Sequence, residues 1–164
     1  MNHFATSAAI AVLFGAAVPL AAGIPLPYPA DAHEAHTTFS AGEPGKPKRP
    51  ARVVMVTMKE GDGKMSYSPD RIEVRKGEQI RFILKNNGLL DHEFMLATIE
   101  DNLKHAELMK KFPEMEHDDP NSKRLKPNGT SEILWRFTKS GEFEFACLIP
   151  GHREAGMHGK VIVK

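Results

Sequence analysis

Residues 141–164 read GEFEFACLIPGHREAGMHGKVIVK, and this stretch contains the features that decide the fold. Phe143, Phe145 and Cys147 occupy alternate positions, so a β-strand would place their side chains on one face. Two valines near the end of the stretch repeat the alternation and predict a second strand. The loop between these strands therefore begins with a thiol that points toward the core.

The same alternation of apolar residues recurs through the region upstream. The alternating sets are Val54, Val56 and Met58; Ile72 and Val74; Ile80, Phe82 and Leu84; His92, Phe94 and Leu96; and Ile133, Trp135 and Phe137. With the two C-terminal segments they make seven strands, bounded by turn dipeptides such as Lys76-Gly77 and Asn128-Gly129. This spacing predicts an all-β fold, either an antiparallel sandwich or a small barrel.

The stretch from Thr98 to Pro127 breaks the strand pattern. Thr98 and Asp101 have the spacing of a capping box, and Pro113 would end a helix that began there. At about 100° per residue, six apolar side chains share one broad arc of this helix. They are Ile99, Leu103, Ala106, Leu108, Met109 and Phe112. We therefore expect one helix packed on the sandwich, followed by a loop over residues 114–127.

The first 32 residues have the pattern of a secretory signal peptide. An apolar, alanine-rich run leads to Ala30-Asp31-Ala32, which matches the A-x-A cleavage signature. Cleavage after Ala32 would place the protein in the periplasm. Because only His3 stands where Lys or Arg is usual, a retained membrane anchor is the alternative; without such an anchor, no membrane association is expected.

The mature chain then divides into an arm and a single domain. Residues 33–51 contain several Gly, Pro and basic residues and have no apolar period, which predicts a flexible arm. Residues 52–164 carry all the predicted strands and the helix. One compact domain of this length can bury a core, and a second domain does not fit.

Charge and cysteine content exclude several classes of protein. The chain has 22 Lys and Arg against 21 Asp and Glu, so its net charge of +1 gives no basic surface for nucleic acid. Cys147 is the single cysteine, which rules out an internal disulfide and a two-cysteine metal site. In an oxidising compartment such a thiol would need burial or a bound metal to escape oxidation.

The loop after Cys147 supplies a set of metal ligands. Cys147, His152 and Met157 have the spacing C-x4-H-x4-M, and His92 lies on a strand that can pair alongside. Two imidazoles and a thiolate in a trigonal set, with a weak thioether bond, make the ligand field of an electron-transfer copper site. The sequence therefore predicts one copper ion that alternates between Cu(I) and Cu(II).

These motifs resemble those of the cupredoxins, the type 1 copper proteins. The Cys-x-x-Pro-Gly-His start is similar to the azurin loop, and the full loop spacing resembles that of rusticyanin. The segment Ile72–Glu78 and the His92-Glu93-Phe94 strand also match the family, over about residues 52–164. The helical insert and the end of the ligand loop resemble the exported copper-tolerance cupredoxins of the CopI type.

The resemblance implies a Greek-key β-sandwich of seven or eight strands with one inserted helix. By matching position, it also implies that His92, Cys147 and His152 are the equatorial copper ligands and that Met157 is the axial one. One position departs from the family pattern: azurins and plastocyanins have Asn after the first ligand His, where this chain has Glu93. The colour and potential of the site depend on such neighbours.

Two non-copper interpretations of Cys147 remain alternatives. It could be a small buried hydrophobe, or a nucleophile activated by His152. The nucleophile is disfavoured because an inward thiol, His92 and Met157 would have no part in that chemistry. No H-x-H pair is present to build a trinuclear copper cluster. We therefore expect a protein that is not an enzyme.

Two functions fit the predicted site. The first is an exported, monomeric electron carrier that docks briefly with a redox protein through His152 and its apolar neighbours Leu148, Ile149 and Pro150. The second is a copper-tolerance protein that handles excess periplasmic copper. It could use a second copper site built from surplus soft and imidazole ligands, which are His33, His36, His105, Met109, Met115 and His117.

Overall fold

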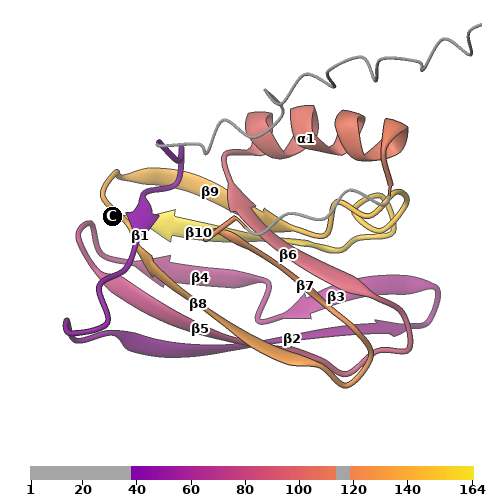
Figure 1. Ribbon diagram of the computed structural model, residues 1–164, viewed down its shortest axis with the longest axis horizontal. Helices are drawn as coiled ribbons and strands as arrows, with labels where there is room; N and C mark the ends of the chain where they lie inside the picture. The colour runs from indigo at the N-terminus through magenta and orange to yellow at the C-terminus, as the bar shows by residue number, and fades with distance from the viewer. Residues whose placement is uncertain (1–37, 114–118) are drawn as a thin grey trace, which may run out of the picture. The chain divides into compact units, whose positions relative to one another are not determined.

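The computed structural model describes residues 38–113 and 119–164 and shows a two-sheet β-sandwich with one helix (Figure 1). The elements are β1 (Glu43–Pro44), β2 (Arg52–Gly61), β3 (Lys64–Ser68), β4 (Arg71–Val74), β5 (Gln79–Asn86), β6 (His92–Ala97), α1 (Ile99–Lys111), β7 (Ser122–Leu125), β8 (Thr130–Arg136), β9 (Gly141–Ala146) and β10 (His158–Val163). The predicted signal peptide and the residues His33, His36, Met115 and His117 lie outside the described ranges.

Each sheet has five strands, and the helix follows the first strand to carry a predicted metal ligand. One sheet has the order β1-β8-β5-β2-β3, and the other has the order β4-β10-β9-β6-β7. The predicted β-sandwich with one helix is confirmed, and all seven predicted strands are present. The prediction of a purely antiparallel sandwich is wrong, because β2 pairs with β5, and β4 with β10, in parallel. Alternation of side chains carries no information on strand direction.

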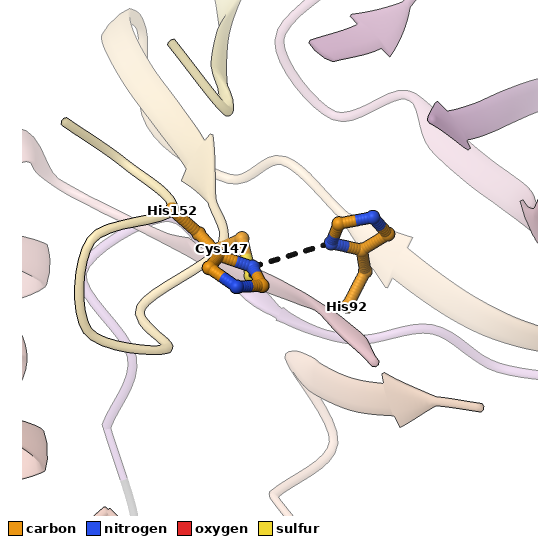
Figure 2. A group of neighbouring side chains, drawn as sticks. All are labelled: His92, Cys147 and His152. Atoms are coloured by element: carbon orange, nitrogen blue, oxygen red, sulfur yellow. Dashed lines mark hydrogen bonds between the residues drawn. The ribbon is translucent and has the colours of Figure 1, made fainter. Parts of the chain in front are cut away.

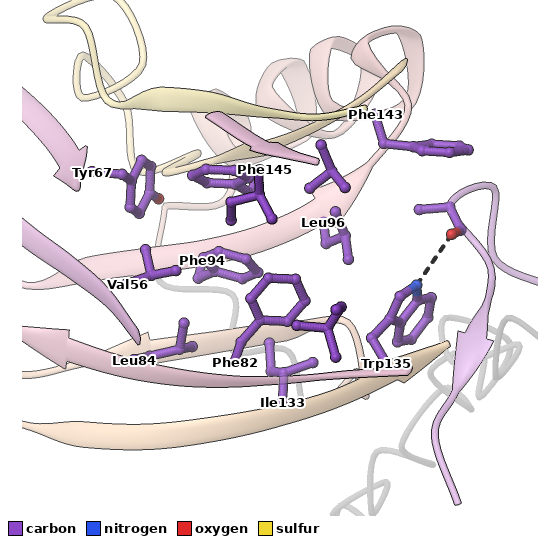
Figure 3. Packing of buried hydrophobic residues seen from close by; sticks show 14 of the residues in the cluster. Val56, Tyr67, Phe82, Leu84, Phe94, Leu96, Ile133, Trp135, Phe143 and Phe145 are labelled. Atoms are coloured by element: carbon purple, nitrogen blue, oxygen red, sulfur yellow. Dashed lines mark hydrogen bonds between the residues drawn. The ribbon is translucent and has the colours of Figure 1, made fainter. Parts of the chain in front are cut away.

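Aromatic side chains from both sheets form the core between them (Figure 3). Phe94 of β6 stacks on Phe145 of β9, with ring centroids 5.1 Å apart, and Phe82 of β5 packs on Phe94 from the opposite sheet. All three side chains are fully buried, and burial of each contributes roughly 2–3 kcal/mol. Because His92 begins β6 and Cys147 directly follows β9, this packing fixes the strands that position two of the predicted ligands.

The helix α1 begins where the capping signal predicts. The Thr98 hydroxyl accepts a hydrogen bond from the Asp101 N–H at 3.2 Å and donates one to the Asp101 carboxylate at 2.7 Å. Figure 1 shows α1 lying over the sheet that contains β6 and β9. Its centre packs through Met109 against Met95, Ala146 and Leu148.

The predicted apolar arc of α1 is wider than the buried one. Met109 at its centre is buried, but Ile99, Leu103, Leu108 and Phe112 on the flanks are 37–55% exposed. A helix laid on the outer face of a sheet contacts it along a narrow strip, so the flanking side chains stay in solvent. The sequence reading also missed Asn102, a buried polar residue in the same strip.

The predicted loop over residues 114–127 contains a strand. Residues 122–125 form β7, which pairs with β6 and places Leu125 opposite His92 and Arg124 opposite Glu93. The four residues Ser-Lys-Arg-Leu are too short and polar to show strand alternation in the sequence. They are ordered by pairing with β6 rather than by their own pattern.

The predicted flexible arm also differs from the structure in its described part, residues 38–51. Strand β1 pairs with β8, and the Trp135 indole N–H donates to the Ala41 carbonyl at 3.2 Å. The Gln79 side chain accepts from the Lys46 N–H at 2.7 Å and donates to the Arg49 carbonyl at 3.2 Å. Distant residues on β5 and β8 therefore hold a segment whose own composition is typical of a linker, and the compact part of the chain begins before residue 52.

Candidate metal centre

His92, Cys147 and His152 converge at one end of the sandwich (Figure 2). His92 begins β6, Cys147 directly follows β9, and His152 lies in the loop before β10. The two imidazole Nδ1 atoms are 3.3 Å apart, and the Cys147 Sγ is 3.3 Å from the His152 Nδ1. One donor atom from each residue lies within 4.8 Å of the others. The structure thus brings together three of the four predicted ligands.

The donor atoms have the spacing that a single metal ion requires. Three ligands at about 2.1 Å from a trigonal ion are about 3.6 Å from one another, close to the two distances of 3.3 Å between His152 and the other donors. His92 and Cys147 are fully buried, and His152 is partly exposed. A soft sulfur with two imidazole nitrogens suits copper in either oxidation state. These residues therefore fit a copper ion reached from the side of His152.

Main-chain hydrogen bonds fold the ligand loop back on itself. The Met157 N–H donates to the His152 carbonyl at 3.0 Å, and the Cys147 N–H donates to the Met157 carbonyl at 3.1 Å. Gly151 and Gly156 turn the chain with φ values of 88° and 105°, which side chains rarely permit. Met157 is fully buried in the same core cluster as Cys147. The loop thus brings the main chain of Met157 back to Cys147, and the axial role of Met157 stays a prediction.

The Cys147 thiol is buried, and besides His152 it contacts the main chain of Glu93. Its Sγ accepts a hydrogen bond from the Glu93 N–H at 3.3 Å. Burial raises the pKa of Cys147 to about 12, although the Glu93 N–H acts in the opposite direction. The thiol is therefore protonated in the metal-free protein at neutral pH. Metal binding must displace this proton, and the charge of the ion supplies the free energy.

Both imidazoles are set up to offer Nδ1 to a metal. The His92 Nε2 donates to the Glu60 carboxylate at 2.6 Å, which leaves the Nδ1 lone pair of His92 facing His152. Burial, together with the nearby His92, lowers the pKa of His152. A neutral His152 has a lone pair for a metal, so this ring needs no deprotonation near neutral pH.

Glu93 connects the strand of the first ligand to the loop of the others. Its carboxylate accepts hydrogen bonds from the Leu148 N–H and the Ser122 hydroxyl, both at 3.2 Å. Its carbonyl accepts a hydrogen bond from the Tyr67 hydroxyl, and its N–H donates to Cys147. The residue that departs from the family pattern therefore links β6, β7 and the ligand loop.

A second buried carboxylate anchors the ligand loop on its other side. Arg153, next to His152, donates two hydrogen bonds to Glu144 of β9, at 2.8 and 3.2 Å. Glu144 is 3% exposed and also accepts a hydrogen bond from Asn102 of α1 at 3.2 Å. The sequence reading identified neither this network nor Glu60. Glu144 alternates with Phe143 and Phe145 as a surface residue does, whereas Glu60 lies near the end of β2 and Arg153 lies in a loop, so no sequence pattern distinguished them.

Other sequence-predicted residues lie apart from the three clustered donors or in different surroundings. Leu148, expected in an exposed patch beside His152, is 2% exposed and packs under α1 with Met109. The exposed apolar residues near the site are Leu89 and Leu90, whose N–H groups donate to Glu60. His105 lies on α1, four residues before Met109.

Comparison with known families identifies the family of the chain. The family described as copper binding proteins of the plastocyanin/azurin family matches residues 54–164, which include all the predicted ligands. The chain belongs to this family. Its members are cupredoxins, copper is therefore the metal of this cupredoxin, and the clustered sulfur and imidazoles are its candidate ligands.

Individual relatives agree with this assignment. The copper-resistant cuproprotein CopI of Rubrivivax gelatinosus is 46% identical over 135 residues, which span 82% of this cupredoxin and 79% of the relative. CopI of Pseudomonas aeruginosa is 38% identical over 134 residues, spanning 62% and 72% of the two chains. The reduced auracyanin of Roseiflexus castenholzii superimposes with a TM-score of 0.57 at 19% identity, over 71% of this chain and 99% of auracyanin. This last likeness concerns the fold.

The described part of this cupredoxin contains no helix with the length and apolar character needed to span a membrane.

Proposed function

We propose that this protein is a periplasmic one-electron carrier with a type 1 copper site. His92, Cys147 and His152 would hold the ion in a trigonal set, and Met157 would supply the weak axial bond. A bound copper ion supplies reversible one-electron redox chemistry. The convergence of one thiol and two imidazoles, with one donor atom of each within 4.8 Å of the others, carries this proposal.

The surroundings of the ligands favour electron transfer over catalysis. Stacked aromatic side chains hold β6 and β9, and main-chain hydrogen bonds close the ligand loop. Ligands held in this way move little when the charge of the site changes, which keeps the barrier to electron transfer low. His92 and Cys147 are fully buried, so substrate access to the donor atoms is restricted.

His152 is the proposed route for electrons between the site and a redox partner. It is the most exposed of the three clustered donors, and the apolar residues Leu89 and Leu90 lie on the loop that bonds to Glu60 beside His92. An imidazole edge near exposed apolar residues suits brief docking, because little polar surface must be desolvated. This location replaces the apolar surface that the sequence predicted at Leu148.

The absorption spectrum of the copper-loaded protein tests the site. Strong sulfur-to-Cu(II) charge-transfer bands should be present in the native protein and absent from Cys147→Ser. Met157→Leu should keep the bands but shift their relative intensities, because only the axial bond is lost. His158→Ala is the matched control, since His158 is exposed and follows Met157 directly. A metallated native protein without these bands would contradict the copper assignment.

Copper tolerance is the second candidate function. The relatives that match over most of this chain are named copper-resistant cuproproteins, which supports a role in copper handling. In this interpretation, the same copper site would serve tolerance, and a further site could use the ligands of the insert. Met109 packs against Met95 and Leu148. A second copper site in the insert that used Met109 would therefore need a thioether that is also part of this hydrophobic cluster.

Growth and copper stoichiometry distinguish the two functions. A carrier predicts one copper per chain and impaired redox metabolism at ordinary copper when the gene is deleted. A tolerance protein predicts a growth defect confined to high copper, and loss of rescue by Cys147→Ser. If His105→Ala with Met109→Leu leaves both copper stoichiometry and tolerance unchanged, the insert holds no functional copper.

Export is proposed from the N-terminal sequence. N-terminal sequencing of the protein from a periplasmic fraction should begin at His33. Recovery of the intact N-terminus in the membrane fraction would instead support a retained anchor.

A further inference from the structure

Glu60 of β2 accepts three hydrogen bonds at the back of the metal centre. The His92 Nε2 donates to Oε1 at 2.6 Å, and the Leu90 N–H donates to the same oxygen at 3.1 Å. The Leu89 N–H donates to Oε2 at 2.9 Å. His92 lies 32 residues further along the chain, so the contact depends on the pairing of β2 with its sheet and the return of the β5–β6 loop.

The loop before β6 is shaped around this carboxylate. A Cβ added to Gly88 would overlap both carboxylate oxygens of Glu60, so glycine is what allows the loop to approach so closely. The Gly88 N–H donates to the side chain of Asn86, which is fully buried and also donates to the Leu90 carbonyl. Hydrogen bonds to Asn86 therefore hold the loop at Gly88 and Leu90, on both sides of Leu89, which donates to Glu60.

Three N–H donors stabilise the negative charge of the Glu60 carboxylate. They are the main-chain N–H groups of Leu89 and Leu90 and the ring Nε2–H of His92. The His92 ring is fully buried, so solvent does not compete for its Nε2. An ionised carboxylate that accepts the distal N–H of an imidazole increases the electron density on the other ring nitrogen.

We propose that Glu60 is a positioning residue of the copper site: it fixes the Nε2–H tautomer and the orientation of His92, and its charge favours Cu(II) over Cu(I). This inference rests on the proposed function, in which His92 Nδ1 is a copper ligand. It assigns to Glu60 control of the reduction potential, an effect that a residue important only for folding would not have.

The test is the reduction potential of two copper-loaded variants. Glu60→Gln removes the charge, and Gly88→Ala keeps the charge but pushes the carboxylate away from His92. Outer hydrogen-bond partners of metal ligands typically alter affinity by about 10- to 100-fold. We expect Cu(II) affinity to fall about tenfold more than Cu(I) affinity, which raises the potential by about 59 mV for a one-electron couple.

Glu142→Gln is the matched control. It removes one negative charge from an exposed ion pair with Lys160 at the opposite end of β9 from Cys147. Its potential should stay close to that of the native protein. Equal potentials for Glu60→Gln and Glu142→Gln would overturn the proposal, as would an unchanged potential in Gly88→Ala.

A measurement on the native protein covers the case in which the variants do not fold. In the Cu(I)-loaded protein with ¹⁵N-labelled histidine, NMR should show a slowly exchanging Nε2–H on His92. A proton on Nδ1 of His92 would overturn the tautomer assignment. Failure of the proposed function gives a different result. The native Cu(II) protein would then lack charge-transfer bands, and the Glu60 variants would lack them as well.

Discussion

Removal of the Glu93 carboxylate should destabilise the fold far more than neutralisation of its charge. The side chain is 4% exposed and accepts hydrogen bonds from the Leu148 N–H and the Ser122 hydroxyl, which belong to residues 2% and 1% exposed. Glu93→Ala leaves both groups buried without this partner. Glu93→Gln can still accept from Leu148 through its carbonyl oxygen and donate to Ser122 through its amide.

The expected loss follows from the two stranded groups. Each buried polar group left without a partner costs about 1–3 kcal/mol, so Glu93→Ala should lower the free energy of unfolding by about 4 kcal/mol. For a chain of this size, that corresponds to a fall in Tm of about 12 °C. Glu93→Gln should lose about 1 kcal/mol or less, because its shape and hydrogen bonds are conserved.

Urea and thermal unfolding of the metal-free proteins measure both values. Copper is left out because a ligand that binds only the folded state would mask part of the difference. Equal unfolding free energies for the Ala and Gln variants would refute the reasoning, since the two hydrogen bonds would then contribute nothing to the link between β6 and the ligand loop.

Three further predictions concern the ligand loop, the N-terminal segment and the thiol. Arg153→Met removes a partner of the buried Glu144 carboxylate and should lower the free energy of unfolding by about 3 kcal/mol, measured in urea. Gln79→Ala removes the side chain that holds Lys46 and Arg49, so trypsin should cleave this segment about tenfold faster in the native state, as expected for the loss of roughly 1.4 kcal/mol of hydrogen bonding. Because burial raises the pKa of Cys147 to about 12, iodoacetamide should not label the metal-free folded protein at pH 8, whereas labelling in urea should go to completion.

Each of these predictions has a control or an outcome that contradicts it. Lys160→Met breaks an exposed ion pair with Glu142 and should change the free energy of unfolding by less than about 0.5 kcal/mol. If Arg153→Met lowers the free energy of unfolding no more than Lys160→Met does, the Arg153–Glu144 pair does not act as a buried ion pair. Unchanged trypsin cleavage in Gln79→Ala would show that β1 alone holds the segment. Rapid labelling of the folded protein would show that Cys147 is accessible or ionised.

The part of the candidate site that lies close together in the chain could be predicted from the sequence. Cys147, His152 and Met157 lie within eleven residues, and the alternation of Phe143 and Phe145 determines the direction of the thiol. The structure confirms that Cys147 joins the core cluster while the next residue, Leu148, faces α1. Strand periodicity contains this information because it depends only on neighbouring residues.

Errors arose where order depends on distant partners. Residues 38–51 resemble a linker, but Trp135 and Gln79 hold them on the sandwich. Strand β7 has too few residues to show a period, but it pairs with β6. The helix arc was predicted too wide, because a sequence shows which side chains are apolar and not how much of them a neighbouring sheet covers.

The sequence by itself determined the all-β fold class, the helix cap at Thr98 and the chemical nature of the donor set, since each depends on residue type and short-range spacing. Only the tertiary structure decided that Glu60 contacts His92 and that Glu93 contacts the ligand loop, across 32 and 55 residues of chain. A carboxylate on a strand has the same sequence pattern whether it faces water or a buried imidazole. Its role is decided by which segments the folded sheets bring beside it.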